Sequence, residues 1–251
     1  MNDRPYTLIE HLTEIRRRLL HALTVFAIAF CGLCYFANDL YQTIAQPLLS
    51  VLPAGAQMIA TQVATPFTTP MKLALFASLL LTLPYLLYQI WGFVAPALFQ
   101  HEKRRVLPLI LLSCLLFYLG MAFAYFVVFP IMFKFFTETA PVGVTVATDI
   151  SFYLDFVLGM LFSFGTAFQV PVAIWLLCWI GVTTPQELAA KRSYMIVAAF
   201  TIAMFLTPPD VLSQTLLAIP LCLLFELGLL MGKLYSRPQS TGLIESEADA
   251  L

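Results

Sequence analysis

The chain has 251 residues, of which 61% are hydrophobic and only 11% are charged. A soluble domain carries about 25% charged residues, so this composition excludes a water-soluble globular protein and indicates an integral membrane protein. The formal net charge is -1 and the basic residues lie in short clusters between apolar runs, which excludes nucleic acid as the expected partner.

Six apolar runs follow one another along the chain, and each is a candidate transmembrane helix. About 20 apolar residues are needed to cross about 30 Å of hydrocarbon. The runs cover residues 19–36, 73–94, 106–128, 156–180, 194–206 and 212–231. The fifth run reaches only about 20 Å as a helix, and Gln214 and Glu226 bound the fully apolar part of the sixth. We therefore expect an all-α membrane protein of six transmembrane helices with two short C-terminal spans.

The basic residues predict the orientation of these spans, because Lys and Arg in short loops are retained on the cytoplasmic side. Only Lys72 and Lys134 lie on the outward side. The others all lie on the opposite side, at Arg4, Arg16, Arg17, Arg18, Lys103, Arg104, Arg105, Lys191, Arg192, Lys233 and Arg237. We expect both termini in the cytoplasm, the N-in and C-in arrangement. Residues 1–236 should form one membrane domain, and residues 237–251 a disordered tail.

The first apolar run follows a charged segment and is not followed by a signal-peptidase site, so we expect it to stay attached and to insert into a bacterial cytoplasmic membrane. The outward connections, residues 37–70 and 129–152, should form short caps over the helix ends. Prolines inside the predicted spans remove backbone donors and should kink the helices into a curved bundle; they are Pro84, Pro108, Pro171 and Pro220.

Few polar side chains could carry chemistry, and the sequence predicts no catalytic residues, no metal site and no cofactor. The three histidines lack HExxH spacing, and GxSxG and phosphate-loop motifs are absent. Glu226, in the last span, is either a functional carboxylate or part of a capping or interhelical hydrogen bond near the interface. On spacing alone, Glu14 is best explained by an i,i+4 ion pair with Arg18, and Glu102 by a favourable place in the first turn of a helix.

Four sequence motifs favour a functional role for Glu14 and Glu102 over these structural explanations. They are HLTEIRRRLL at residues 11–20, YQIWGFVAPALFQHEKR at residues 88–104, FYLGMAFAYFVVFP at residues 117–130 and LTPPDVLSQTLLAIP at residues 206–220. Together and in this order they resemble the TatC family, the core receptor subunit of the twin-arginine protein translocase. The resemblance covers essentially the whole chain except its tail.

The resemblance implies a six-helix subunit that binds twin-arginine signal peptides of folded proteins through Glu14 and Glu102. Other positions linked by resemblance to that site or its scaffold are Arg16, Phe93, Pro96, Leu98 and Pro47. The chemistry is reasonable, because a carboxylate can accept two parallel N–H bonds from a guanidinium, which Lys cannot reproduce. It further implies partner subunits of the TatA and TatB type, a homo-oligomeric receptor complex, and transport driven by the proton gradient.

One position departs from the family pattern. The family commonly has a glutamate in a stretch like FGxxFExP, where this chain has FGTAFQVP with Gln169. Glutamine keeps hydrogen-bonding capacity at membrane depth but cannot carry charge, so we expect it to face the polar interior. By resemblance, Met204, Thr207 and Gln214 would contact a single-span partner, although hydrogen bonding within the chain would also explain the two polar ones.

Two other classes of function have weaker support in the sequence. A small-molecule secondary transporter would need ionisable groups around a cavity at the membrane midplane, and the first five spans have none at their centres. An intramembrane enzyme would need a catalytic dyad facing a cavity. The sequence therefore favours a receptor subunit over either alternative.

Overall fold

The computed structural model describes residues 8–50, 58–98, 103–139, 148–207 and 210–235. Within them the chain is helical, and the only extended pairing is a single parallel bridge between Ile59 and Asp149. The helices are α1 (Leu8–Cys34), α2 (Ala37–Leu49), α3 (Thr65–Leu98), α4 (Lys103–Phe123), η1 (Ala124–Val128), α5 (Phe129–Glu138), α6 (Ile150–Ala167), α7 (Val170–Ile180), α8 (Pro185–Ala190), α9 (Arg192–Leu206) and α10 (Val211–Tyr235). The all-helical prediction is confirmed.

Five helical stretches of the described chain are long and apolar enough to cross a membrane. They are Thr13–Cys34, Thr65–Gln89, Leu107–Glu138, Ile150–Ile180 and Val211–Lys233. A sixth, shorter apolar stretch is Arg192–Phe205 in α9. Each of the six predicted spans therefore has a helical counterpart.

The prediction of two short C-terminal spans is right for α9 and wrong for α10. The 15 residues of α9 cover about 22 Å, whereas the 25 residues of α10 cover about 37 Å. Glu226 does not end the apolar stretch, because Arg192 at the start of α9 neutralises it with contacts of 2.7 Å and 2.8 Å. A paired charge can lie within a span where an isolated one would be costly.

Two outward connections also differ from the prediction. Residues 65–70 were expected in a connection, yet α3 begins at Thr65, with Pro66 in the first turn where its missing N–H costs nothing. Residues 129–138 continue the fourth helix through the π-helical turn η1 instead of forming a separate cap. Pro130 explains that turn, since it cannot donate to the carbonyl four residues back. Among the described residues of the two connections, α2 is the one separate short helix, and it packs against α3 and α5.

The prolines in the predicted spans have unequal effects. Only Pro171 coincides with a break, between the end of α6 and the start of α7. Helix α3 continues through Pro84, and the carbonyl of Leu80, which Pro84 leaves without a helical donor, accepts the hydroxyl of Tyr118 at 2.6 Å. A tyrosine on α4 thus replaces the lost hydrogen bond and joins two helices.

Pro47 in α2 acts in the same way. Its missing N–H leaves the carbonyl of Thr43 without its helical donor, and the hydroxyl of Tyr125 in η1 donates to that carbonyl at 2.7 Å. The hydroxyl of Tyr153 in α6 donates to the next carbonyl, that of Ile44, at 2.8 Å. These bonds fix the cap helix on the bundle.

The end of the bundle that carries α2 is closed further by Asp149, the N-cap residue of α6. Its carboxylate accepts the hydroxyl of Thr61 at 2.6 Å and the backbone N–H of Thr61 at 2.9 Å, together with the first backbone N–H groups of α6. These hydrogen bonds, the Thr61 hydroxyl first among them, lower the pKa of Asp149 to about 2. Asp149 therefore stays ionised at physiological pH and holds residues 58–61 against α6.

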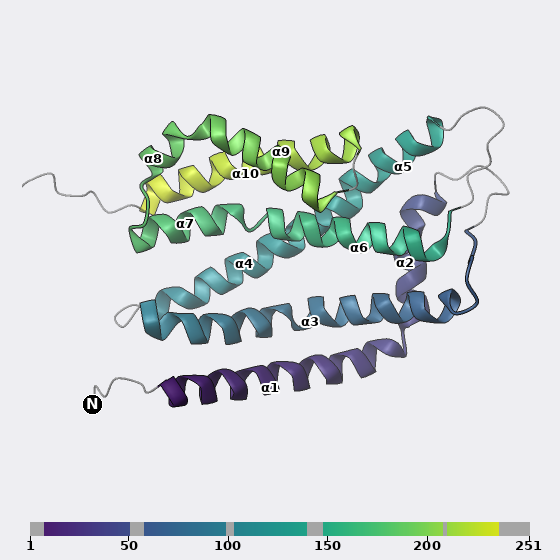
Figure 1. Cartoon of the computed structure of the whole chain (residues 1–251), viewed down its shortest axis with the longest axis horizontal. Helices are drawn as coiled ribbons and strands as arrows, with labels where there is room; N and C mark the ends of the chain where they lie inside the picture. The colour runs from purple at the N-terminus through teal and green to yellow at the C-terminus, as the bar shows by residue number, and fades with distance from the viewer. Residues whose placement is uncertain (1–7, 51–57, 99–102, 140–147, 208–209, 236–251) are drawn as a thin grey trace, which may run out of the picture.

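The helices lie side by side, with α4 crossing the bundle obliquely (Figure 1). The core lies where α4, η1, α5, α6 and α10 meet, around Phe129, Met132, Met160, Phe164 and Leu217. Helix α1 lies at the edge of the bundle against α3 (Figure 1). The start of α1, the start of α4, helix α8 and the end of α10 lie at one end, which we call the basic end because the basic clusters lie there (Figure 1).

Candidate functional site

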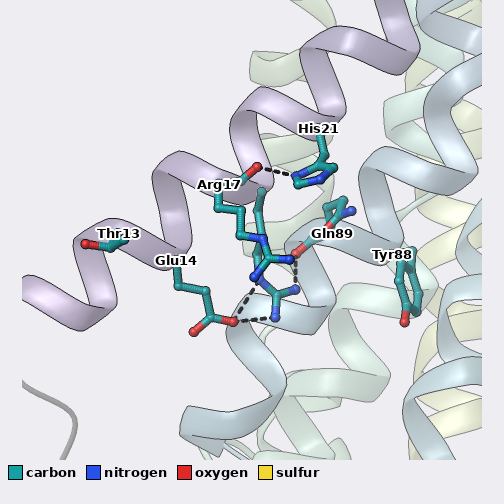
Figure 2. A pocket seen from close by; sticks show the side chains of 7 residues that line it. Thr13, Glu14, Arg17, His21, Tyr88 and Gln89 are labelled. Atoms are coloured by element: carbon teal, nitrogen blue, oxygen red, sulfur yellow. Dashed lines mark hydrogen bonds and ion pairs between the residues drawn. The ribbon is translucent and has the colours of Figure 1, made fainter.

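An open pocket lies between α1 and α3 near the basic end, with a volume of about 660 Å³. Figure 2 shows Glu14, Arg17 and His21 on α1 opposite Gln89 of α3. The residues that line it are Thr13, Glu14, Arg17, Arg18, His21, Tyr88 and Gln89. Polar side chains of both charge signs therefore surround one opening between α1 and α3.

The central contact of the pocket joins Glu14 and Arg18, as their i,i+4 spacing predicted. The Nε and Nη2 atoms of Arg18 donate to the same carboxylate oxygen, Oε1 of Glu14, at 3.0 Å and 2.5 Å. The exposed fraction of the side chain is 27% for Arg18 and 40% for Glu14, so solvent reaches the pair. The carboxylate thus already holds one guanidinium group while remaining accessible from outside.

Helix α3 supplies the other wall. Nη1 of Arg18 donates to the backbone carbonyl of Gln89 at 3.4 Å, which links α1 to α3. The amide of Gln89 donates to the hydroxyl of Tyr85 at 2.7 Å and is thereby turned along its own helix. On α1, Nδ1 of His21 donates to the carbonyl of Arg17 at 2.7 Å, which fixes the ring against the helix.

The structure places the other predicted site residues unevenly. Arg16 lies on α1, two residues after Glu14, with an exposed side chain, and it does not line the pocket. Phe93, Pro96 and Leu98 follow Gln89 on α3, and their side chains lie outside the described residues. Glu102 lies in the connection between α3 and α4, outside the described residues.

Helix α3 contributes Tyr88 and Gln89 to the pocket, and neither residue was predicted to belong to the site. Both residues open the run YQIWGF that supports the family resemblance, which was the available signal. Their approach to α1 depends on a contact between positions 71 residues apart, and helical periodicity says nothing about such contacts.

Gln169 lies at the break between α6 and α7 and contacts α4. Its Oε1 accepts the hydroxyl of Ser113 at 2.5 Å, and its Nε2 donates to the carbonyl of Ser113 at 2.9 Å. Ser113 is buried, so the amide satisfies two polar groups inside the bundle. The side chain thus faces protein and not lipid, as the cost of an unpaired amide in lipid suggests.

The predicted partner-contact residues lie on the α9–α10 hairpin. Met204 is exposed. Thr207 is buried, and its hydroxyl donates to the carbonyl of Ala203 at 2.8 Å. The amide of Gln214 donates to the carbonyl of Phe200 at 3.0 Å. The donors of Thr207 and Gln214 therefore bind within the chain, and Met204 is left as the side chain most available to a partner.

Glu226 makes an interhelical ion pair, one of its two predicted explanations. Nε of Arg192 contacts Oε1 at 2.7 Å and Nη2 donates to Oε2 at 2.8 Å, so each carboxylate oxygen has its own donor. This geometry joins the start of α9 to α10. Both side chains are about half exposed at the basic end.

Comparisons with known proteins agree with this architecture. The family model described as Sec-independent protein translocase protein (TatC) matches residues 10–220. This chain belongs to the TatC family. It is 58% identical to the Sec-independent protein translocase protein TatC of Haemophilus influenzae over 93% of this chain and 91% of that protein. It is 55% identical to the protein of the same description from Escherichia coli K12, over 91% of this chain and 88% of that one.

The fold is also similar to solved TatC structures. A crystal structure described as the twin arginine translocase receptor TatC superposes with a TM-score of 0.78 at 39% identity, covering 91% of this chain and all of that one. A second TatC structure, in detergent, gives the same TM-score at 38% identity. The chain is therefore a multi-pass inner-membrane protein and a core subunit of the twin-arginine translocation system.

Proposed function

We propose that the pocket between α1 and α3 binds the paired arginines of twin-arginine signal peptides, with Glu14 as an acceptor. The observation that carries the proposal is that Glu14 already binds a guanidinium group in this pocket. A carboxylate that is partly exposed and oriented for N–H donors can accept the same group from a peptide. The open form of the pocket supports access from outside the bundle.

Two arginines need two sets of acceptors. Glu102 would be the second acceptor, and Phe93, Pro96 and Leu98 would belong to the same site, as the family resemblance implies. Arg16 would shape the local field beside Glu14. The protein acts here as a receptor, without a catalytic step.

The partners in this proposal are single-span subunits of the TatA and TatB type, further copies of this chain, and folded cargo carried by the signal peptide. The proton gradient would supply the energy. The exposed Met204 on the short helix α9 supports a docking place for a partner helix, while Pro47 would act as scaffold by fixing α2. A bilayer thinned around α9 would favour association there, because mismatch is relieved by packing against another helix.

Site-specific crosslinking tests the receptor proposal. A photo-crosslinker at Thr13, in the pocket, should capture a twin-arginine signal peptide in native membranes and should capture much less of the same peptide with paired lysines. A crosslinker at Phe152 is the matched control, because this side chain is exposed at the outward end of α6. Equal capture at both positions would place the binding site elsewhere.

A separate crosslinking test addresses the partner proposal. Cysteine pairs between Met204 and a TatB-type helix should form disulfides in membranes, and cysteines at Leu119, an exposed position on α4, should not. The opposite pattern would move the docking place away from α9.

A further inference from the structure

We infer that Arg18 is a built-in competitor of the signal peptide: it occupies Glu14 in the resting protein and must leave before a signal arginine binds fully. The inference rests on the proposed function of this pocket. It assigns Arg18 an inhibitory role, in which its guanidinium lowers the affinity of the site for every cationic segment.

The geometry of the pair shows how the exchange can begin. Both described hydrogen bonds from Arg18 to Glu14 end on Oε1, although a guanidinium can serve both oxygens of a carboxylate. The other Arg–Glu pair, Arg192 with Glu226, does use both oxygens. Oε2 of Glu14 can therefore accept a first N–H from an arriving arginine while Arg18 is still bound to Oε1.

After it leaves Glu14, Arg18 can keep a second hydrogen-bond acceptor. Its Nη1 already points to the carbonyl of Gln89 on α3, and the side chain is partly exposed to water. The displaced guanidinium would remain solvated along the wall of the pocket. Breaking an ion pair is costly when it leaves a buried charge without a partner. Arg18 is partly exposed, so its departure from Glu14 does not carry that cost.

The consequence of this competition is a lower apparent affinity for the signal peptide. When only the fraction of molecules with Arg18 away from Glu14 can bind, the apparent dissociation constant rises by the inverse of that fraction. A partly exposed i,i+4 pair is weak, so removing the competitor should tighten binding about three- to sixfold. Because the competitor acts before any ligand is present, paired-arginine and paired-lysine signals should tighten by the same factor.

The test uses the purified full-length chain in nanodiscs and a fluorescent twin-arginine signal peptide. We expect R18Q to bind the peptide about three- to sixfold more tightly than wild type, with the arginine-to-lysine preference unchanged. R17Q removes the same charge from the neighbouring residue without breaking the described pair, so it reports the effect of the local field and should tighten binding less. R192Q breaks the other Arg–Glu pair, away from the pocket, and should leave the affinity unchanged.

A second measurement covers the case in which R18Q does not fold. In R18K the amine at position 18 should react faster with an amine-specific reagent when the twin-arginine peptide is added, since the peptide takes its place on Glu14. Mass spectrometry separates this site from the native lysines. An unchanged labelling rate on peptide binding would overturn the inference, as would R18Q that folds and binds no more tightly than R17Q.

Failure of this inference can be told apart from failure of the proposed function. If E14A weakens binding but R18Q does not tighten it, the pocket remains the binding site and Arg18 is only a structural partner. If E14A leaves binding unchanged, the pocket is not the binding site, and Arg18 cannot be a competitor of the signal peptide.

Discussion

Two pairs of neighbouring helices are held together in opposite ways. Between α4 and α6 the backbones approach closely: a Cβ added at Gly120 would lie 2.6 Å from the carbonyl oxygen of Phe164, and one added at Gly165 would lie 2.7 Å from the ring of Phe117. Between α1 and α3 the described contacts at the basic end are a partly exposed ion pair, a 3.4 Å hydrogen bond and an open pocket.

This difference suggests that the two helix pairs have different roles. Close packing tolerates little change in shape, so α4 and α6 can serve as a fixed frame. Weak, solvent-exposed polar contacts can be exchanged at little cost, so the α1–α3 side can open for a peptide. The proposed binding site lies on the side that can change.

The largest expected effect is on peptide binding at the adjustable side. E14A should weaken binding of a twin-arginine signal by about ten- to hundredfold, because a charge-assisted contact worth about 1.5 to 3 kcal/mol is lost. E102A should have a similar effect, and neither should remove the protein from the membrane. Binding is measured by crosslinking titration in native membranes. Unchanged crosslinking in both variants would return Glu14 and Glu102 to a structural role.

The next effect concerns the fixed frame. G120A should destabilise the protein by about 1 to 3 kcal/mol, because the new methyl group meets a backbone carbonyl that cannot rotate away. G159A, also on a helix of this pair, is the matched control, since nothing lies within 4 Å of its added Cβ. Thermal unfolding of both full-length variants in detergent decides the matter. If the two melt alike, the close approach of α4 and α6 is wrong.

A smaller effect is expected at Gln169, which joins the frame to α7. Q169L should cost about 1 kcal/mol, because the hydroxyl of Ser113 loses its acceptor inside the bundle. Q169E can still accept that hydrogen bond, so Q169L should impair transport of a twin-arginine reporter protein more than Q169E. The reverse order would place this side chain outside any polar site.

The smallest effect tests how α3 is joined to the frame. Y118F should cost about 0.5 to 1.5 kcal/mol, since the carbonyl of Leu80 loses its donor. In a P84A background the helix itself supplies an N–H to that carbonyl, so the cost of Y118F should shrink. Thermal unfolding of the four proteins gives the coupling between the two sites. Equal costs of Y118F in both backgrounds would show that Pro84 does not explain the hydrogen bond.

Much of this architecture follows from local sequence. Apolar runs located all six helices, and i,i+4 spacing located the pair of Glu14 and Arg18. Errors arose where a local signal was outweighed by a distant partner. Glu226 was expected to shorten the last span, but a charge on another helix neutralises it. Prolines and threonines before residue 73 suggested a loop, but proline is compatible with the first turn of α3.

The second wall of the pocket could not be derived from local sequence. That Arg18 reaches the carbonyl of Gln89 depends on how α1 and α3 pack, and both helices are apolar over most of their surface. In lipid, apolar helix surfaces have no strong preference for one neighbouring helix, so periodicity cannot predict which helices pack together. The motif that includes Gln89 indicated its importance without indicating its place.

The most direct test of the account is a cryo-electron microscopy structure of the full-length chain with a twin-arginine signal peptide bound. We expect a signal guanidinium on the carboxylate of Glu14, Arg18 displaced towards the carbonyl of Gln89, and an unchanged contact between Gly120 and Phe164. A bound signal peptide that lies away from the α1–α3 pocket, with Arg18 still on Glu14, would contradict it.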